Sequence, residues 1–328
     1  QTDYLSGGGS AAVRWLENTF DLPAALTARG FSCVYEPAFG VSVIHSFKQN
    51  ARTAALNAAK SDVNIVCVGT GGRVEFEEGD RLSMRLSEVQ ERAILDSAAC
   101  NPNTVVIVFA GAAVDMSAWE DSVAAILYAG FPGMGGAEAL ADILTGKVNP
   151  SGKLSETFPL DLEDVPAAGT YRRAGVTRYQ EGLDVGYRYF DTYDVPVLYP
   201  FGHGLSYSEF FYRDLRLSLE DGRVVAEYVV ENVSERDGRE VSQVYVGEDV
   251  PLVYRPKKEL KGFSKDLIKA GKCVKVRVGL DFRAFAHWNA ARDTWTVTDG
   301  VYTVSVGASV GDIRLTAKLR VEDGKFVL

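Results

Sequence analysis

The stretch Asn64–Gln90, NIVCVGTGGRVEFEEGDRLSMRLSEVQ, decides the fold of this chain. Ile65–Gly69 is a continuous run of β-branched and small apolar residues ending in glycine, which is typical of a strand buried on both faces. Ser87, with Gln90 three residues later, predicts a capping box at the start of a helix. The order strand, loop, helix places the loop at the carboxyl end of a parallel strand, where open α/β sheets carry their sites.

That loop contains three carboxylates in four residues, Glu75, Glu77 and Glu78, and Asp80-Arg81 follows them. Acidic side chains this close repel one another, and a carboxyl that stays protonated near neutral pH can act as a general acid. Two carboxyls in different environments are what glycoside hydrolysis needs. The alternative is a solvated acidic loop, which is the usual fate of a run of charge.

Length and composition limit the possible classes of protein. A chain of 328 residues predicts two domains, and 46% hydrophobic with 24% charged residues predicts well-formed cores. The net charge of -9 argues against a nucleic-acid partner and against an anionic membrane. The first residues lack an initiator Met and a signal-peptide pattern, so we expect a piece of a longer protein. Compartment and oligomeric state, including a homo-oligomer, stay open.

The residues do not suggest a cofactor or a metal. The four cysteines form no CxxC pair and the three histidines are scattered, so we expect no metal site. Cys33 and Cys67 fall in apolar runs and are predicted to be buried free thiols. GTGGR at Gly69–Arg73 resembles a nucleotide loop, but it leads into carboxylates instead of a helix N-terminus, which disfavours nucleotide binding.

The first half of the chain alternates between helical and strand patterns. It therefore predicts an α/β sandwich over residues 1–160, with a mostly parallel sheet that has helices on both faces and carries the acidic loop. Trp119–Val123 and Ala124–Tyr128 continue the pattern. Helices are predicted at Ala11–Gly30, Ala51–Ala59, Ser87–Ala99 and Gly136–Leu144, and the other strands at Ser32–Tyr35 and Thr104–Phe109.

The second half has a different character. Residues 161–209 predict an irregular connection, whose aromatic segments Tyr179–Phe190 and Tyr199–Tyr207 either offer flat faces to sugar rings or pack the connection against both domains. Residues 210–328 contain short alternating runs separated by turns, which predict an antiparallel β-sandwich of immunoglobulin or fibronectin type III kind. The runs include VVAEYVVEN, EVSQVYVG, CVKVRVGL, YTVSVGA and IRLTAKLRV.

Several motifs together resemble glycoside hydrolase family 3, whose members include β-glucosidases and β-xylosidases. The resemblance covers essentially the full chain, and NPSGKL with FGHGLSY is its most specific part. It implies an α/β sandwich followed by a fibronectin type III-like domain, in enzymes that also have an (α/β)8 barrel. The matching segments are Gly7–Ser10, Glu75–Arg81, Trp119–Gly146, Asn149–Pro159, Glu181–Asp191, Tyr199–Phe210, Glu231–Val246 and Arg255–Phe263.

The resemblance implies that one loop glutamate is the general acid/base, within a pattern like E-x-E-G-x-D-R. Alignment on Asp80-Arg81 places Glu75 and Glu77 on the two glutamates, whereas alignment on the Glu-Gly pair selects Glu78. We rank Glu77 first, Glu78 second and Glu75 third. Glu75, Asp80 and Arg81 are expected to belong to the substrate site, with Asp80 and Arg81 holding the loop in shape through a carboxylate–guanidinium contact.

The family's nucleophile is a barrel aspartate, and no Asp here has a matching Ser-Asp-Trp context. The chain is thus expected to be part of a retaining exo-β-glycosidase acting on β-linked oligosaccharides or glycosides, without a cofactor. The barrel would precede it, follow it or belong to another polypeptide, and the chain would be inactive alone. The alternative is a non-catalytic module that binds carbohydrate or protein.

Overall fold

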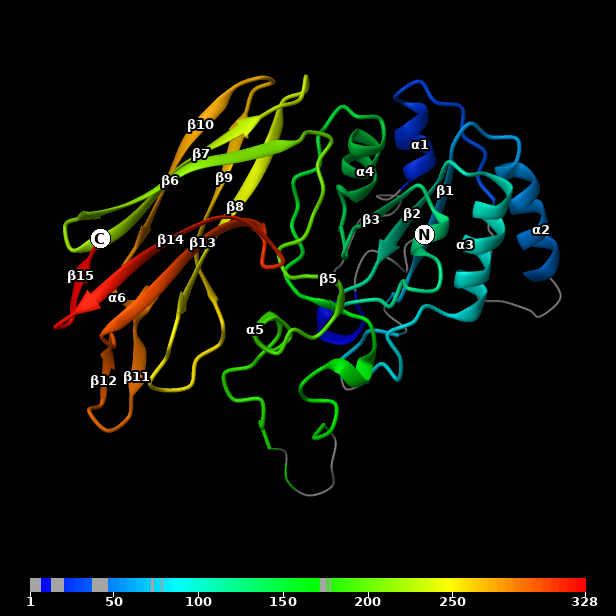
Figure 1. Cartoon of the computed structure of the whole chain (residues 1–328). Coiled ribbons are helices and arrows are strands. Elements are labelled where there is room, and N and C mark those ends of the chain that lie inside the picture. Colours follow the sequence, from blue (N-terminus) through cyan, green and yellow to red (C-terminus); the bar gives the residue numbers. More distant parts are fainter. Residues whose placement is uncertain are drawn as a thin grey trace. The chain divides into compact units, whose positions relative to one another are not determined.

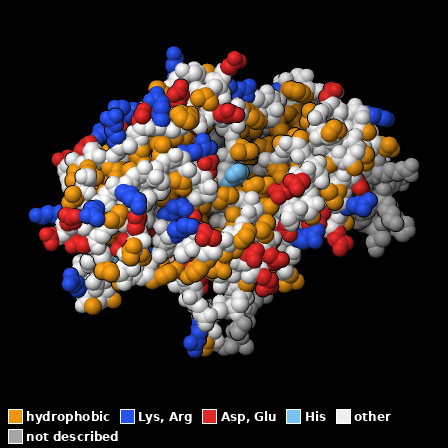
Figure 2. All heavy atoms as spheres, in the orientation of Figure 1, with side chains coloured by type: hydrophobic (Ala, Val, Ile, Leu, Met, Phe, Trp, Pro, Cys, Tyr) orange, Lys and Arg blue, Asp and Glu red, His pale blue; other side chains and the backbone are white. Residues whose placement is uncertain are grey.

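The computed structural model describes residues 7–12, 21–36, 47–71, 74–77, 79–171, 176 and 178–328 (Figure 1). The chain divides into two compact units, each described here by itself. Unit 1 comprises residues 1–148 and 160–162, and unit 2 comprises residues 149–159 and 163–328. None of the described helices is long and apolar enough to cross a membrane. On the face drawn in Figure 2, acidic and basic side chains are interspersed.

Unit 1 is built on a parallel sheet of order β1-β2-β3, so the predicted α/β fold class is confirmed. The apolar runs become strands because both of their faces are covered by helices. Its elements are η2 (Gly9–Ala11), α1 (Leu22–Thr27), α2 (Phe47–Ala58), β1 (Asn64–Gly69), α3 (Glu88–Cys100), β2 (Thr104–Phe109), η3 (Glu120–Ser122), β3 (Ala125–Tyr128) and α4 (Gly136–Leu144).

Successive side chains of β2 point to the two opposite faces of this sheet. Ile107 and Phe109 lie in one core cluster with residues of α1 and α4. Val106 and Val108 are fully buried and point to the opposite face, because successive side chains of a strand alternate. Helix α3 packs against β1 and β2. The double-sided burial holds the carboxyl ends of β1 and β2 in register, with Gly69 opposite Phe109.

Two expectations for unit 1 are wrong. Residues 31–36, which include the predicted strand Ser32–Tyr35, form no strand, and no described strand pairs with them. Without a neighbour the apolar run stays open: Val34 is 72% exposed and Cys33 is an exposed thiol, not a buried one.

Cys67 lies within β1, and burial raises the pKa of its thiol to about 12. The predicted helix Ala11–Gly30 is described only in part, since residues 13–20 lie outside the described ranges.

Unit 2 contains an antiparallel β-sandwich, as the predicted fold class requires, and a connection precedes it. Its two main sheets have the orders β10-β7-β6 and β15-β14-β13-β8-β9. The elements of the connection are β4 (Phe158–Pro159), η4 (Leu162–Asp164), α5 (Tyr187–Thr192) and β5 (Val197–Tyr199). The sandwich contains β6 (Phe210–Glu220), β7 (Arg223–Asn232), β8 (Gly238–Glu248), β9 (Glu259–Ile268), β10 (Cys273–Leu280), α6 (Phe282–Phe285), β11 (His287–Asn289), β12 (Thr294–Thr296), β13 (Gly300–Ser309), β14 (Asp312–Glu322) and β15 (Lys325–Val327).

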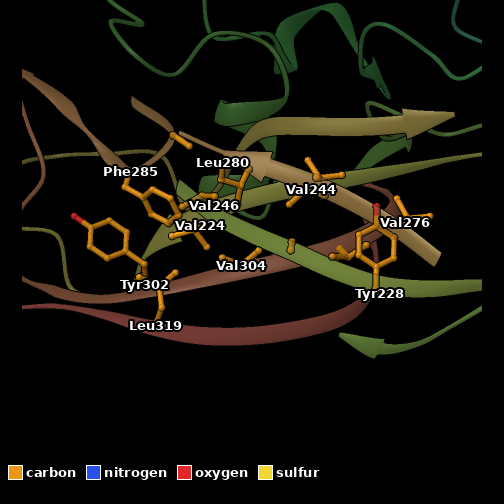
Figure 3. Close-up of a cluster of buried hydrophobic side chains, with 14 of the residues drawn as sticks. Val224, Tyr228, Val244, Val246, Val276, Leu280, Phe285, Tyr302, Val304 and Leu319 are labelled. Atoms are coloured by element: carbon orange, nitrogen blue, oxygen red, sulfur yellow. The ribbon is translucent and has the colours of Figure 1, made fainter. Parts of the chain in front are cut away.

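The core of the sandwich takes side chains from both sheets, because the strands alternate between inward and outward residues. Figure 3 shows Val224 and Tyr228 of β7 together with Val244 and Val246 of β8 and Val304 of β13. All five are at most 1% exposed. Because every second residue of these strands enters the shared core, the period-two runs in the sequence predict the sandwich.

The aromatic residues of the connection pack within unit 2. Tyr187 stacks on Phe201 with ring centroids 4.6 Å apart, and Tyr199 stacks on His203 at 5.1 Å. Gly202 has φ +81°, a conformation that residues with side chains rarely adopt, and a Cβ there would lie 2.1 Å from Gln243 Oε1, so a side chain at this position would be strained. These contacts favour the packing role for this part of the connection.

Substitution of Gly69 by alanine should destabilise unit 1, because the new Cβ would lie 2.0 Å from the carbonyl oxygen of Phe109. Overpacking of this kind costs about 1–3 kcal/mol. Hydrogen exchange of the β2 amides measures that loss of opening free energy. Gly135→Ala is the matched control, since a Cβ at Gly135 meets nothing within 4 Å. Equal protection in both variants would contradict the close contact.

His203 should make the stability of unit 2 depend on pH. Burial, aided by nearby Lys153, lowers the pKa of His203 below its ordinary value of 6.5. The unfolded state then binds the proton more readily, so the free energy of unfolding should fall as the pH drops from about 7 to about 5. In His203→Asn this slope should flatten. Urea unfolding at several pH values measures it, and an unchanged slope in the variant would assign the dependence to other groups.

Candidate active site

The acidic loop begins where β1 ends, and Gln90 of α3 fixes that end. The side-chain amide of Gln90 accepts a hydrogen bond from Gly69 N (3.2 Å) and donates one to Gly69 O (3.0 Å). The capping box predicted from Ser87 and Gln90 is therefore wrong: Ser87 is the N-cap residue, but its side chain makes no cap hydrogen bond. Gln90 instead joins the start of the helix to the last residue of the strand.

Arg81 determines the course of the loop. Its Nη1 donates to Glu75 Oε1 and to the carbonyl oxygen of Ala113, both at 3.0 Å, and its Nη2 donates to the carbonyl oxygen of Met84 at 3.0 Å. The Arg81 and Glu75 side chains are only 14% and 13% exposed. Three acceptors around one guanidinium tie the loop to the segment that follows β2, since a planar fork fixes several partners at once.

Glu75 is occupied by this network through both of its carboxylate oxygens. While Oε1 accepts from Arg81, Oε2 accepts from the backbone N–H of Gly111, at 2.7 Å. Gly111 lies just beyond the end of β2, so Glu75 connects the carboxyl ends of two neighbouring strands. A carboxylate that holds a charge partner and a backbone donor in this way is committed to shaping the site.

Glu77, two residues on, has a different environment. It is exposed, and its described hydrogen bonds come from Ser10: the Ser10 hydroxyl donates to Glu77 Oε2, and Ser10 N donates to the same oxygen over 3.4 Å. No described cation forms an ion pair with it. Glu77 therefore has an accessible carboxyl, whereas the carboxyl of Glu75 is largely shielded and paired with Arg81, so the two have different environments.

The remaining candidates are placed less informatively. Glu78 lies outside the described residues. Asp80 is exposed. The guanidinium of Arg81, which was expected to hold the loop together with Asp80, forms an ion pair with Glu75. Within the described ranges, no group of three or more His, Cys, Asp or Glu could hold a metal ion.

Two groups of this site were not foreseen from the sequence. Ser10 contacts Glu77 across 67 positions, and Gly111 contacts Glu75 across 36. The GGGS segment at Gly7–Ser10 contributes to the family resemblance, but nothing in its residues predicts a partner. Such long-range pairs depend on how the chain folds back on itself, so no local pattern could have found them.

Comparison with known proteins decides the family. Residues 1–207 match the glycosyl hydrolase family 3 C-terminal domain, and residues 240–310 match the fibronectin type III-like domain. The chain belongs to glycosyl hydrolase family 3. Among its relatives, an exo-α-(1→6)-L-arabinopyranosidase of Bifidobacterium longum is 35% identical over 99% of this chain and 43% of the relative. Thermostable β-glucosidase B of Acetivibrio thermocellus is 41% identical over 80% of this chain and 36% of the relative.

Solved structures agree with this membership. The family 3 β-glucosidase of Bifidobacterium adolescentis superposes with a TM-score of 0.88 and 37% identity, over 92% of this chain and 45% of that one. The glucose complex of the Kluyveromyces marxianus β-glucosidase gives a TM-score of 0.82 and 33% identity, over 88% and 35%. The chain thus spans less than half the length of these family 3 proteins.

The pairing of Arg81 with Glu75 should be measurable as coupling between the two residues. In a double-mutant cycle with Arg81→Met and Glu75→Gln, we expect a coupling free energy of about 1–3 kcal/mol, because each single change leaves a largely buried partner uncompensated. Urea unfolding of the four proteins gives the value. The control cycle uses the exposed pair Arg92–Asp96, for which about 0.5 kcal/mol or less is expected. Additive effects at residues 75 and 81 would contradict the clamp.

Proposed function

We propose that this chain is part of a retaining exo-β-glycosidase and that Glu77 is its general acid/base. The observation that carries the proposal is the unequal treatment of the two described glutamates. Glu75 has both oxygens engaged by Arg81 and Gly111, whereas Glu77 is exposed and meets no described cation. Proton transfer to a substrate requires an accessible carboxyl, so Glu77 suits that task and Glu75 suits support of the loop.

The reaction would need a second carboxylate from a barrel outside these residues. In the proposed mechanism a barrel aspartate attacks the anomeric carbon while Glu77 protonates the departing glycosidic oxygen. A glycosyl-enzyme forms, and Glu77, now ionised, takes a proton from the water that hydrolyses it. The two carboxyl carbons should then lie about 5–5.5 Å apart in the assembled enzyme. Arg81 and Glu75 keep the loop in place, and Asp80 is a further candidate for the substrate site.

The family and the names of the relatives support the proposed substrate class. Several relatives are β-glucosidases, and two are exo-acting arabinopyranosidases. We therefore propose a terminal sugar of a glycoside or oligosaccharide, with β-glucosides as the first substrates to test. The reaction itself calls for two carboxyls and water, and no cofactor.

Glu77→Gln should separate substrates by their leaving groups. For alkyl glucosides, which need protonation to depart, kcat/KM should fall by about 10²–10⁴-fold, the usual contribution of a general acid. For dinitrophenyl glucoside, whose leaving group departs unprotonated, formation of the glycosyl-enzyme should change little. The assay uses the chain combined with a family 3 barrel, with each part alone as the blank. Azide should accelerate turnover of the activated substrate by Glu77→Ala.

Glu75→Gln is the matched comparison, since it removes one charge from the same loop. It should lower activity on both substrates to a similar extent, because it disturbs the loop that Arg81 holds. An equal loss on both substrates for Glu77→Gln would contradict the acid role. Oligosaccharide binding without turnover in the combined protein would point instead to a non-catalytic binding module.

A further inference from the structure

We infer that Ser10 is a positioning residue for Glu77, an inference that rests on the proposed role of Glu77 as the acid/base. Ser10 lies in the GGGS segment, Gly7–Ser10, which no comparison assigns a task. Both of its donors, the hydroxyl and the backbone N–H, converge on one oxygen, Glu77 Oε2. Held through Oε2, the carboxyl presents Oε1 as the oxygen that carries the proton to the substrate.

The backbone of the GGGS segment explains how Ser10 reaches this position. Gly8 N donates to the carbonyl oxygen of Glu75 over 2.8 Å, and Gly8 forms a parallel bridge with Phe76. The segment thus runs alongside residues 75–77 like a short additional strand. Two residues after this bridge, the chain brings Ser10 to Glu77. The loop that Arg81 holds through Glu75 is therefore also bound by the GGGS segment.

Gly9 makes the close approach possible. Its φ of +64° is a conformation that residues with side chains rarely adopt, and a Cβ there would lie 3.0 Å from the Cβ of Glu77. A larger residue at position 9 would press directly on the glutamate. The motif therefore combines a bridging glycine, a glycine without bulk and a serine with two donors, each facing the acidic loop.

The contacts of Ser10 suit positioning of the Glu77 carboxyl better than simple attachment of the GGGS segment to the fold. An exposed glutamate side chain has several rotatable bonds, and fixing one oxygen removes most of its freedom before substrate arrives. Misplacement of a catalytic group by about 1 Å can cost about 10²-fold in rate.

The contact itself can be tested in the 328-residue chain without any activity. In a pH titration followed by NMR, the Ser10 amide should shift together with the ionisation of Glu77. That titration should vanish in Glu77→Gln and persist in Glu75→Gln. A Ser10 amide that does not respond to pH, or that responds equally in both variants, would overturn the inference.

The positioning role is tested in the combined enzyme with the same two substrates. Ser10→Ala should lower kcat/KM for alkyl glucosides by about 10–100-fold, with little effect on dinitrophenyl glucoside, and Ser10→Thr should restore most of the loss. Gly9→Ala should show the same selective loss. Gly30→Ala is its control, because Gly30 also has positive φ (+90°) but a Cβ there meets nothing within 4 Å.

Failure of this inference and failure of the proposed function give different results. If Glu77→Gln shows the leaving-group pattern and Ser10→Ala lowers both substrates equally, Ser10 only supports the fold and the inference is wrong. If Glu77→Gln itself shows no pattern, the acid/base assignment fails first. Selective loss in both variants, with rescue by Ser10→Thr, is the result that we expect.

Discussion

The guanidinium of Arg81 is the contact on which the geometry of this site depends. It binds a carboxylate and a backbone carbonyl oxygen of the loop between β1 and α3, and a second carbonyl oxygen from the segment after β2, and it lies largely buried among them. An arginine in this position requires a carboxylate, because a buried cation without one costs several kcal/mol. Glu75 meets that requirement, and Gly111 N completes its hydrogen bonding. The loop between β1 and α3 is thereby fixed to the carboxyl edge of the sheet.

This arrangement also reduces the repulsion between the closely spaced carboxylates of the loop. With Glu75 compensated by Arg81, an additional carboxylate nearby is tolerated, and Glu77 can remain at the surface with hydrogen bonds from Ser10. The two glutamates, only two residues apart, thus have unlike surroundings. Enzymes that hydrolyse glycosides depend on such differences between carboxyls. Family membership is the reason to propose glycoside hydrolysis. The contacts of the loop are the reason to propose Glu77, and not Glu75, as its acid/base.

The sequence predicted the parts of the fold that rest on burial. Thr104–Phe109 and Gly136–Leu144 have the predicted limits. A strand with two covered faces leaves a continuous apolar run, and a helix with one apolar face leaves a period of about 3.6 residues. Ser32–Tyr35 failed because a strand also needs a neighbour to pair with, and its apolar pattern cannot report whether one is present. Gln90 failed as a capping residue because Gly69, distant in sequence, takes its side chain. The composition of the acidic loop is enough to find it, but the different surroundings of Glu75 and Glu77 depend on partners 36 and 67 positions away.

A crystal structure of the chain assembled with its barrel and an unhydrolysed glycoside analogue tests the account most directly. We predict that Glu77 Oε1 lies within about 2.6–3.2 Å of the glycosidic oxygen, the reach of a general acid. Glu75 should still be bound to Arg81, facing away from the sugar. A structure in which Glu75 or Glu78 approaches that oxygen, with Glu77 turned toward solvent, would contradict the assignment.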